Sequence, residues 1–141
     1  MKIKIKLDPG AKMPTKAYKR DAGFDLYTPY AFTLWPGYGN QESVDTRVHI
    51  QIPEGLCGMV KSKSGLYIRN HITCEGVIDS GYTGSIVVSL DNHTDVPIRF
   101  EAGQKIAQLV IIPVPMVILE EVNKLEETER GDKGFGSSGR F

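Results

Sequence analysis

Apolar and polar residues alternate with a period of two along much of the chain. The clearest runs cover residues 2–7, 47–52, 85–90 and 96–100. Because neighbouring side chains of a strand point to opposite faces, each run predicts a short β-strand with one face towards a core. Turn-forming Gly, Pro, Asn and Asp residues recur between the runs. This arrangement is typical of a sandwich, jelly roll or barrel built from many short strands.

Three segments depart from the alternation. Residues 105–114 are apolar on both faces, which predicts a strand covered on both sides. Residues 64–70 start with a serine that suits a helix N-cap, and they predict a short helix. Residues 120–129 are acidic and polar, as expected of a linker. We therefore expect an all-β domain over residues 1–119, the linker, and a C-terminal arm over residues 130–141.

Composition narrows the class of protein. A chain of 141 residues has the length of one domain with one core. Its 17 Lys and Arg residues balance 17 Asp and Glu residues, so no excess charge points to nucleic acid or an anionic membrane. Cys57 and Cys74 lack a CxxC spacing and are expected to be free thiols in a reducing compartment. Without an apolar run of about 18 residues or an apolar leader, the protein is expected to be soluble and cytoplasmic.

The last twelve residues, 130–141, contain four glycines, which make an arm costly to order. Arg130 suits a bidentate phosphate contact, Phe135 offers a face for stacking on a base, and closely spaced glycine amides can face an anion. A disordered tail and a lid over a nucleotide both agree with this composition.

Three further segments carry candidate chemistry. Asp25 lies between two apolar residues, Phe24 and Leu26, so alternation places those two in the core and Asp25 on the opposite, exposed face. Ser64 opens the expected helix, where free amides favour an anion, although serine caps are common. Asp79 falls at the turn of an expected hairpin among glycines, which fits either a ligand-facing loop or an ordinary turn.

Five segments, in this order, resemble the motifs of the trimeric dUTPase (deoxyuridine 5′-triphosphate nucleotidohydrolase) family: residues 21–27, 63–66, 76–84, 103–110 and 130–139. The resemblance spans nearly the whole chain. It implies a distorted, jelly-roll-like β-barrel and a homotrimer with three shared sites. It also implies Mg²⁺-dependent hydrolysis of dUTP to dUMP and pyrophosphate, which limits uracil in DNA and supplies dUMP for dTMP synthesis.

The resemblance also assigns roles to residues around the triphosphate. Asp79 matches the carboxylate that deprotonates a water for attack on the α-phosphorus, a task that needs a positioned base. Asp25 and Gln108 match residues that hold waters of the Mg²⁺ ion bound by the triphosphate. The matching phosphate-contacting loop contains Lys63, Ser64 and Gly65.

Base, sugar and arm contacts follow from the same resemblance. Backbone groups between Thr73 and Tyr82 match the hairpin that pairs with the uracil edge, and this hairpin includes Gly76, Val77 and Ile78. Tyr82 matches the ring that leaves no space for a 2′-hydroxyl. In the arm, the resemblance assigns the γ-phosphate clamp to Arg130, uracil stacking to Phe135, and the last phosphate donors to Gly136, Ser137 and Ser138.

The chain departs from the family pattern at several positions. Lys63 stands where arginine is usual, which keeps the charge and loses the planar fork. Gly81 and Thr83 replace an aspartate and an arginine that are frequent in the third motif, and Lys133 replaces a frequent glycine in the arm. The segment from Trp35 to Ser43 is longer and more polar than a minimal loop.

Two other functions stay open on the sequence alone. A dCTP deaminase or bifunctional relative shares the scaffold but needs a base placed for attack on the ring. A regulatory protein that uses the nucleotide pocket as a switch would dock a partner through the segment from Trp35 to Ser43. The scattered His49, His71 and His93 form no metal-ligand motif, and Cys74 is expected to be a structural thiol.

Overall fold

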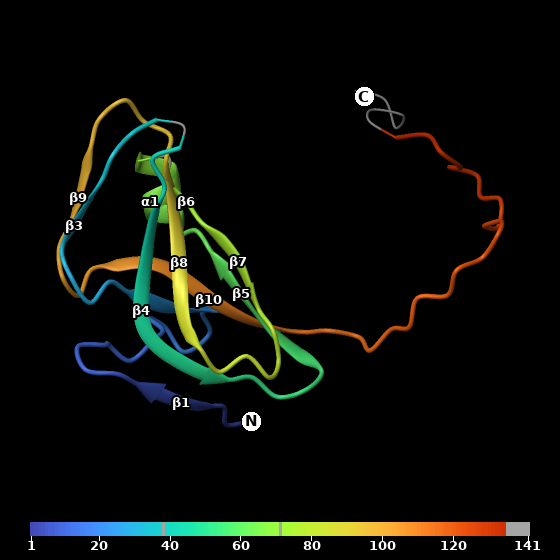
Figure 1. The fold of residues 1–141 in the computed structure, drawn as a ribbon, viewed down its shortest axis with the longest axis horizontal. Helices are drawn as coiled ribbons and strands as arrows, with labels where there is room; N and C mark the ends of the chain where they lie inside the picture. The colour runs from blue at the N-terminus through green and yellow to red at the C-terminus, as the bar shows by residue number, and fades with distance from the viewer. Residues whose placement is uncertain (38, 71, 135–141) are drawn as a thin grey trace.

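A computed structural model describes residues 1–37, 39–70 and 72–134 of the chain (Figure 1). These residues form mostly strands and one short helix. The strands are β1 (Lys4–Leu7), β2 (Gly23–Tyr27), β3 (Phe32–Leu34), β4 (Glu42–Gln51), β5 (Leu56–Lys61), β6 (Ile72–Thr73), β7 (Glu75–Ile78), β8 (Ser85–Asn92), β9 (Ile98–Phe100) and β10 (Lys105–Pro113). The helix is α1 (Ser64–Asn70), with the bounds that the sequence predicts.

Two four-stranded antiparallel sheets enclose the core. One has the order β1-β4-β8-β6 and the other β2-β10-β5-β7, while β3 and β9 form a separate pair. The core cluster takes side chains from both large sheets, for example Val44 and Val88 from the first and Val60 and Leu109 from the second. This arrangement confirms the expected all-β, jelly-roll-like fold.

The strand boundaries extend the sequence-based expectations. β4 starts at Glu42, inside the segment expected to be a loop, because Val44 and Thr46 continue its buried face. β10 follows the predicted run, but it is covered on both faces only in its first half, since Ile112 is exposed. The sequence patterns, alternation for β4 and a continuous apolar run for β10, located both strands correctly and missed where their pairing and burial end.

The expected hairpin of β7 with β8 is wrong. β7 pairs with β5, whereas β8 pairs with β4 and with β6, so the turn at residues 79–84 links two different sheets. The chain changes sheet at Cys74, which separates β6 from β7. A period-two pattern predicts a strand but not its neighbour, and so it could not reveal this crossover.

After β10 the chain leaves the body of the fold. Figure 1 shows the segment from residue 114 onward running away from the sheets, and its described part, to residue 134, forms no strand or helix. Cys57 and Cys74 are both buried and free, as expected. Among the described residues, no helix has the length and apolar character needed to cross a membrane.

Candidate functional site

The loop between β5 and α1 is tied to the segment that follows β6. The Cys74 amide donates to Ser62 Oγ at 2.9 Å, and this hydroxyl donates to the Cys74 carbonyl at 3.1 Å. The Lys63 carbonyl accepts hydrogen bonds from the amides of Leu66 and Tyr67, which starts α1. These contacts fix Ser64 at the start of the helix. Cys74 is buried in this arrangement. Burial raises the pKa of its thiol to about 11 and leaves the thiol unreactive near neutral pH.

Gln108 reaches this loop from the adjacent strand β10. Its Nε2 donates to the Ser62 carbonyl at 3.0 Å. The side chain passes over Gly23 of β2, where a Cβ atom would lie 2.5 Å from Gln108 Oε1 and 3.0 Å from Gln108 Cβ. Glycine at position 23 therefore makes the space that the Gln108 side chain occupies.

Asp25 lies beside Gln108, since the two residues are partners in the pairing of β2 with β10. Only 6% of Asp25 is exposed, and its carboxylate accepts hydrogen bonds from Lys63 and, at 2.6 Å, from Lys105. Burial alone would raise the Asp25 pKa, but the hydrogen bonds from Lys105 and Lys63 outweigh it and hold this pKa below its usual value. The carboxylate is thus a charged, buried group held between two ammonium groups.

The expectation that Asp25 is exposed opposite a buried Phe24 is wrong. Phe24 is 37% exposed, with the Lys16 ammonium 4.5 Å from its ring centroid, although Leu26 is in the core as expected. Thr15 covers this edge of the sheet, because its carbonyl accepts the Asp25 amide at 2.7 Å. A register shift in β10 between residues 105 and 107 also breaks simple alternation.

A pocket of about 570 Å³ joins these elements. It brings together residues from β5, α1, β6, β7, β8, β10 and the segments between them, which are Lys61, Ser62, Ser64, Tyr67, Thr73, Cys74, Glu75, Asp91 and Gln108. Of the residues predicted to bind a ligand, Ser64 and Gln108 meet here. Sequence reasoning did not single out Tyr67 or Lys105. Tyr67 stands three positions after Ser64, a helical spacing that places both on one side of α1.

Asp79 lies elsewhere. It borders a separate pocket of about 310 Å³ with Gly55, Val77 and Val114. The turn between β7 and β8, to which Asp79 belongs, lies at the end of the sheets away from α1 (Figure 1). In the same turn, the Tyr82 amide donates to the Asp79 carbonyl at 3.2 Å. A single chain therefore does not bring Asp79 to the pocket that contains Ser64 and Gln108.

The Tyr82 ring is held inside its own turn. Its hydroxyl donates to the Ser85 carbonyl at 3.0 Å. A Cβ atom at position 84 would lie 2.5 Å from Tyr82 Cζ, so the ring packs against Gly84 where only glycine leaves space. The ring is nearly half exposed.

The arm carries the remaining predicted site residues. Arg130 is exposed on the segment that leaves the fold, and its Nε donates to the Lys133 carbonyl at 3.1 Å. Phe135, Gly136, Ser137 and Ser138 lie outside the described residues.

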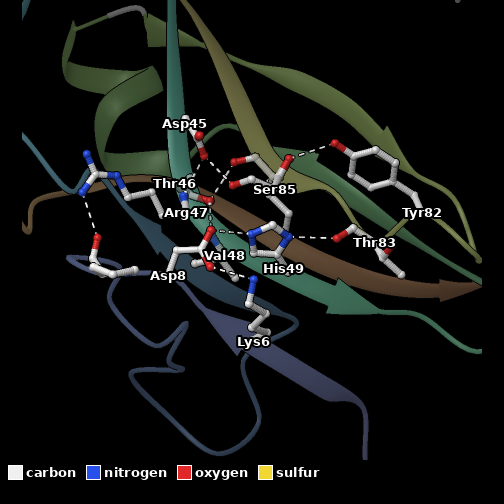
Figure 2. Close-up of polar contacts among 12 residues, drawn as sticks. Lys6, Asp8, Asp45, Thr46, Arg47, Val48, His49, Tyr82, Thr83 and Ser85 are labelled. Carbon is white, nitrogen blue, oxygen red and sulfur yellow. Dashed lines mark hydrogen bonds and ion pairs between the residues drawn. The ribbon is translucent and has the colours of Figure 1, made fainter.

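A second polar cluster surrounds His49 on β4 and reaches the turn of Tyr82 (Figure 2). His49 contacts Asp8 and the Thr83 carbonyl, each at 2.8 Å. Across residues 1–37, 39–70 and 72–134, no three His, Cys, Asp or Glu side chains gather as metal ligands. His71 is not among the described residues.

Comparison with known proteins gives a consistent result. A family model described as dUTPase matches residues 10–139. The deoxyuridine 5′-triphosphate nucleotidohydrolase of Corynebacterium efficiens is 41% identical over 140 residues, covering 96% of this chain and 76% of that protein. The protein of the same name from Clostridium tetani is 39% identical over 143 residues, covering 99% and 97%.

Solved structures give the same similarity in three dimensions. The dUTPase of Staphylococcus bacteriophage 80alpha with dUpNHpp is 32% identical, with a TM-score of 0.89 over 98% of each chain. A mutant dUTPase from phage phi11 of S. aureus, described as coordinating a structural Mg(II) ion, is 26% identical. Its TM-score is 0.81 over 90% of this chain and 100% of that one.

Proposed function

The chain belongs to the dUTPase family, and from this premise we propose that it hydrolyses dUTP to dUMP and pyrophosphate by attack of water on the α-phosphorus. The observation that carries the proposal is the extent of the family match, because residues 10–139 include all five segments that bear the candidate chemistry. The buried, free thiols of Cys57 and Cys74 are compatible with work in the reducing cytoplasm.

The pocket beside α1 is the proposed triphosphate site. Ser64 and Gln108, which line the pocket, would supply a hydroxyl and a side-chain amide, and Gly65, the next residue after Ser64, would supply a backbone amide. Lys63 supplies an ammonium group that is held in place by Asp25 until an anion arrives. These groups suit a polyanion, because phosphoryl transfer depends mainly on positioning and charge neutralisation.

The residues around this pocket fit a magnesium ion that arrives with the triphosphate. A carboxylate has about four acceptor positions, so the two lysines leave Asp25 able to accept from metal-bound waters. Gln108 would hold waters from the neighbouring strand position. Such contacts through water suit Mg²⁺, which gives up its waters reluctantly, and the ion would neutralise phosphate charge.

Asp79 is the proposed base that deprotonates the attacking water. Because Asp79 borders a different pocket from Ser64, one copy of the chain cannot place this base beside its own phosphate site. We propose a homotrimer in which a neighbouring copy supplies Asp79. The segment after β10 supports this assembly, because Ile118 and Leu119 are 98% and 94% exposed in a single chain and would be buried against another copy.

Recognition of the base and the sugar is assigned to β7 and the turn that follows it. Backbone groups of Gly76, Val77 and Ile78 would pair with the uracil edge, and cytosine, which reverses the donors and acceptors, would leave buried polar groups unmatched. Tyr82, packed against Gly84, would stand under the deoxyribose and exclude a 2′-hydroxyl.

The arm, residues 130–141, is proposed to close over the bound nucleotide. Arg130 would clamp the γ-phosphate, Phe135 would stack on uracil, and Gly136, Ser137 and Ser138 would donate to the phosphates. The linker at 120–129 would let the arm reach a site on another copy. Residues 1–119 are assigned to the barrel domain, although its last strand in the described chain, β10, ends at Pro113.

The test is to incubate the purified protein and Mg²⁺ with each dNTP and to measure pyrophosphate and ammonia. We expect pyrophosphate from dUTP alone and no ammonia from dCTP, which separates this activity from deamination. Asp79→Asn should preserve dUTP binding and lower turnover by about 10²-fold or more, because it removes the base. Near-normal turnover of this variant, or equal hydrolysis of dTTP, would refute the proposal.

A second role is proposed for the segment from Trp35 to Ser43. Phage dUTPases, with that of phage 80alpha as the solved example, are described as controlling transfer of virulence genes by a G protein-like mechanism. In the present chain Trp35 is 61% exposed at the start of this segment, and Gly37 and Gln41 border a pocket of about 440 Å³. Such a surface suits a regulatory protein partner. A pull-down with dUTP, repeated after shortening residues 35–41, which lie between β3 and β4, tests this role, and unchanged capture would refute it.

A further inference from the structure

One imidazole ring ties the turn of Tyr82 to the end of β1. His49 Nδ1 lies 2.8 Å from the Thr83 carbonyl oxygen, and His49 Nε2 lies 2.8 Å from Asp8 Oδ2 (Figure 2). Both partners are acceptors only. A neutral imidazole has one N–H and can donate to one of them, whereas the imidazolium ion has two and can donate to both. The full set of contacts therefore requires a protonated ring.

The backbone conformation of β4 determines the position of His49. The pairing of β4 with β8 shifts register between Asp45 and His49, and within the shift Arg47 has a left-handed φ of 59°. His49 is the partner of Lys6 on β1 and of Ser85 on β8. It therefore stands where three strands meet, directly beside the turn that enters β8.

The charged groups on the two neighbouring strands favour the protonated ring. Directly after β1, Asp8 accepts from His49 and, through its other oxygen, from Lys6 at 2.8 Å, while Lys4 borders the same surface. On β4, the Asp45 carboxylate lies close enough to interact with His49 electrostatically. Arg47 points away, since its guanidinium donates to the Pro9 carbonyl at 2.8 Å.

The turn itself contributes no opposing cation. Tyr82 directs its hydroxyl to the Ser85 carbonyl, and Asp79 faces the separate pocket described above. The Thr83 carbonyl and the Asp8 carboxylate raise the pKa of His49, against partial burial and the Lys6 charge, which lower it. The same contacts with Lys6 and His49 lower the pKa of Asp8.

The position of Thr83 makes this contact important for Tyr82. The two residues are consecutive, and the Tyr82 ring is packed against Gly84 on the other side of Thr83. Ser85 is held in turn by a hydrogen bond from its hydroxyl to Asp45. Both ends of the short segment from Thr83 to Ser85 are thus anchored to β4, and the His49 anchor depends on a proton.

We propose that protonated His49 is a positioning residue that holds the turn so that Tyr82 rejects a 2′-hydroxyl, which makes discrimination between dUTP and UTP depend on pH. The inference rests on the proposed function of Tyr82. When the ring loses its proton, one of its two contacts must break. The charged Asp8 carboxylate is the stronger acceptor, so the remaining N–H stays on Nε2 and the contact of Nδ1 with the Thr83 carbonyl is the one that is lost. The turn then gains freedom, and the ribonucleotide is excluded less strictly.

The first experiment measures kcat/KM for dUTP and for UTP from about pH 5 to 9, a range that brackets histidine titration. The ratio of the two values is the informative quantity, because both substrates carry the same titrating triphosphate. We expect this ratio to fall by about three- to ten-fold as pH rises through the His49 pKa, the effect of one hydrogen bond. A ratio that does not change with pH overturns the inference.

Variants separate positioning from general stability. His49→Gln should give the lower ratio at every pH, whereas His49→Lys, which keeps a charge and several donors, should recover the higher ratio without the pH dependence. Arg99→Gln removes a surface cation of β9 that pairs with Glu101, just after the strand, and should keep the wild-type profile. If His49→Gln retains the full wild-type profile, the inference fails.

NMR spectra of the imidazole groups test the contacts of His49 with Asp8 and Thr83 without measuring turnover. Using His49→Gln for assignment, we expect two N–H signals from His49 at low pH and a titration midpoint above the ordinary value for histidine. Asp8→Asn should lower this midpoint and shift the fall in the dUTP-to-UTP ratio to lower pH. A midpoint below the ordinary value, or one that Asp8→Asn leaves unchanged, overturns the inference.

Failure of the proposed function gives a different result. If Tyr82→Ala leaves the dUTP-to-UTP ratio unchanged, Tyr82 has no role in sugar selection and the inference falls with it. If Tyr82→Ala changes the ratio but the wild-type ratio is independent of pH, only the His49 inference is overturned.

Discussion

A single added methyl group at Gly23 should disturb both the stability and the activity of the protein. Gly23 has an ordinary strand conformation, so Gly23→Ala introduces no backbone strain and acts only through packing. The new Cβ would lie 2.5 Å from Gln108 Oε1 and 3.0 Å from Gln108 Cβ. The amide end can swing away only by breaking its hydrogen bond to the Ser62 carbonyl, and the Cβ atom cannot move without shifting β10.

The expected cost follows from these contacts. Loss of the hydrogen bond costs about 1 kcal/mol, and overpacking against Gln108 Cβ adds about 1–3 kcal/mol. We therefore expect Gly23→Ala to lower the free energy of unfolding by roughly 2–4 kcal/mol. Turnover of dUTP should fall too, because Gln108 would leave the pocket beside α1.

Urea unfolding followed by circular dichroism, at one fixed protein concentration, measures the loss of stability. Gly65→Ala is the matched control, because a Cβ at position 65 meets nothing within 4 Å, and it should be neutral or slightly stabilising. In the Gln108→Ala background, Gly23→Ala should cost at least about 1 kcal/mol less than in the wild type. A loss below about 0.5 kcal/mol for the single variant, or strictly additive losses, would refute the packing argument.

Three other predictions test separate parts of the molecule. Removal of residues 133–141 should leave the circular dichroism spectrum and the unfolding midpoint nearly unchanged while almost abolishing dUTP hydrolysis, because the last strand ends at Pro113; an unfolded product would contradict this division. Asp25→Asn should cost roughly 2–3 kcal/mol at neutral pH, because two ammonium groups lose their buried partner. The Asp25 contribution is present above its unfolded pKa of 3.8 and is lost as pH falls through its lowered folded pKa, so acid unfolding curves should show a smaller difference between variant and wild type. The Cys74 thiol, with a pKa near 11, should react with a thiol reagent only on unfolding, and rapid labelling of the native protein would be inconsistent with its burial.

Local patterns were sufficient for the parts of the fold that depend on nearest neighbours. The bounds of α1 follow from the serine at its start, and the strands follow from alternation that leaves one face in the core. The pairing of strands depends on residues far apart in the sequence. That is why the crossover of β7 to β5 could not be predicted from the same pattern.

The site was predictable to the extent that its residues lie in recognisable short segments. Ser64 and Gln108 were identified from separate motifs, and the fold brings them into one pocket. The burial of Asp25 was not predictable, because it depends on Lys63, Lys105 and the edge segment at Thr15, none of which is adjacent to it in the sequence. A buried carboxylate is stable only with such partners, and a pattern of neighbouring residues does not contain them.

His49 illustrates a different limit of sequence reasoning. On the sequence it is a polar residue in an alternating strand, and the absence of a metal-ligand spacing gives no reason to single it out. Its environment is created by a register shift in β4, which turns the ring towards Asp8 on one side and Thr83 on the other. Because Thr83 occupies a position where the family frequently has arginine, no cation from the turn competes with a protonated His49. His49 therefore meets a neutral side chain and a backbone acceptor in this turn, a setting that only the folded structure reveals.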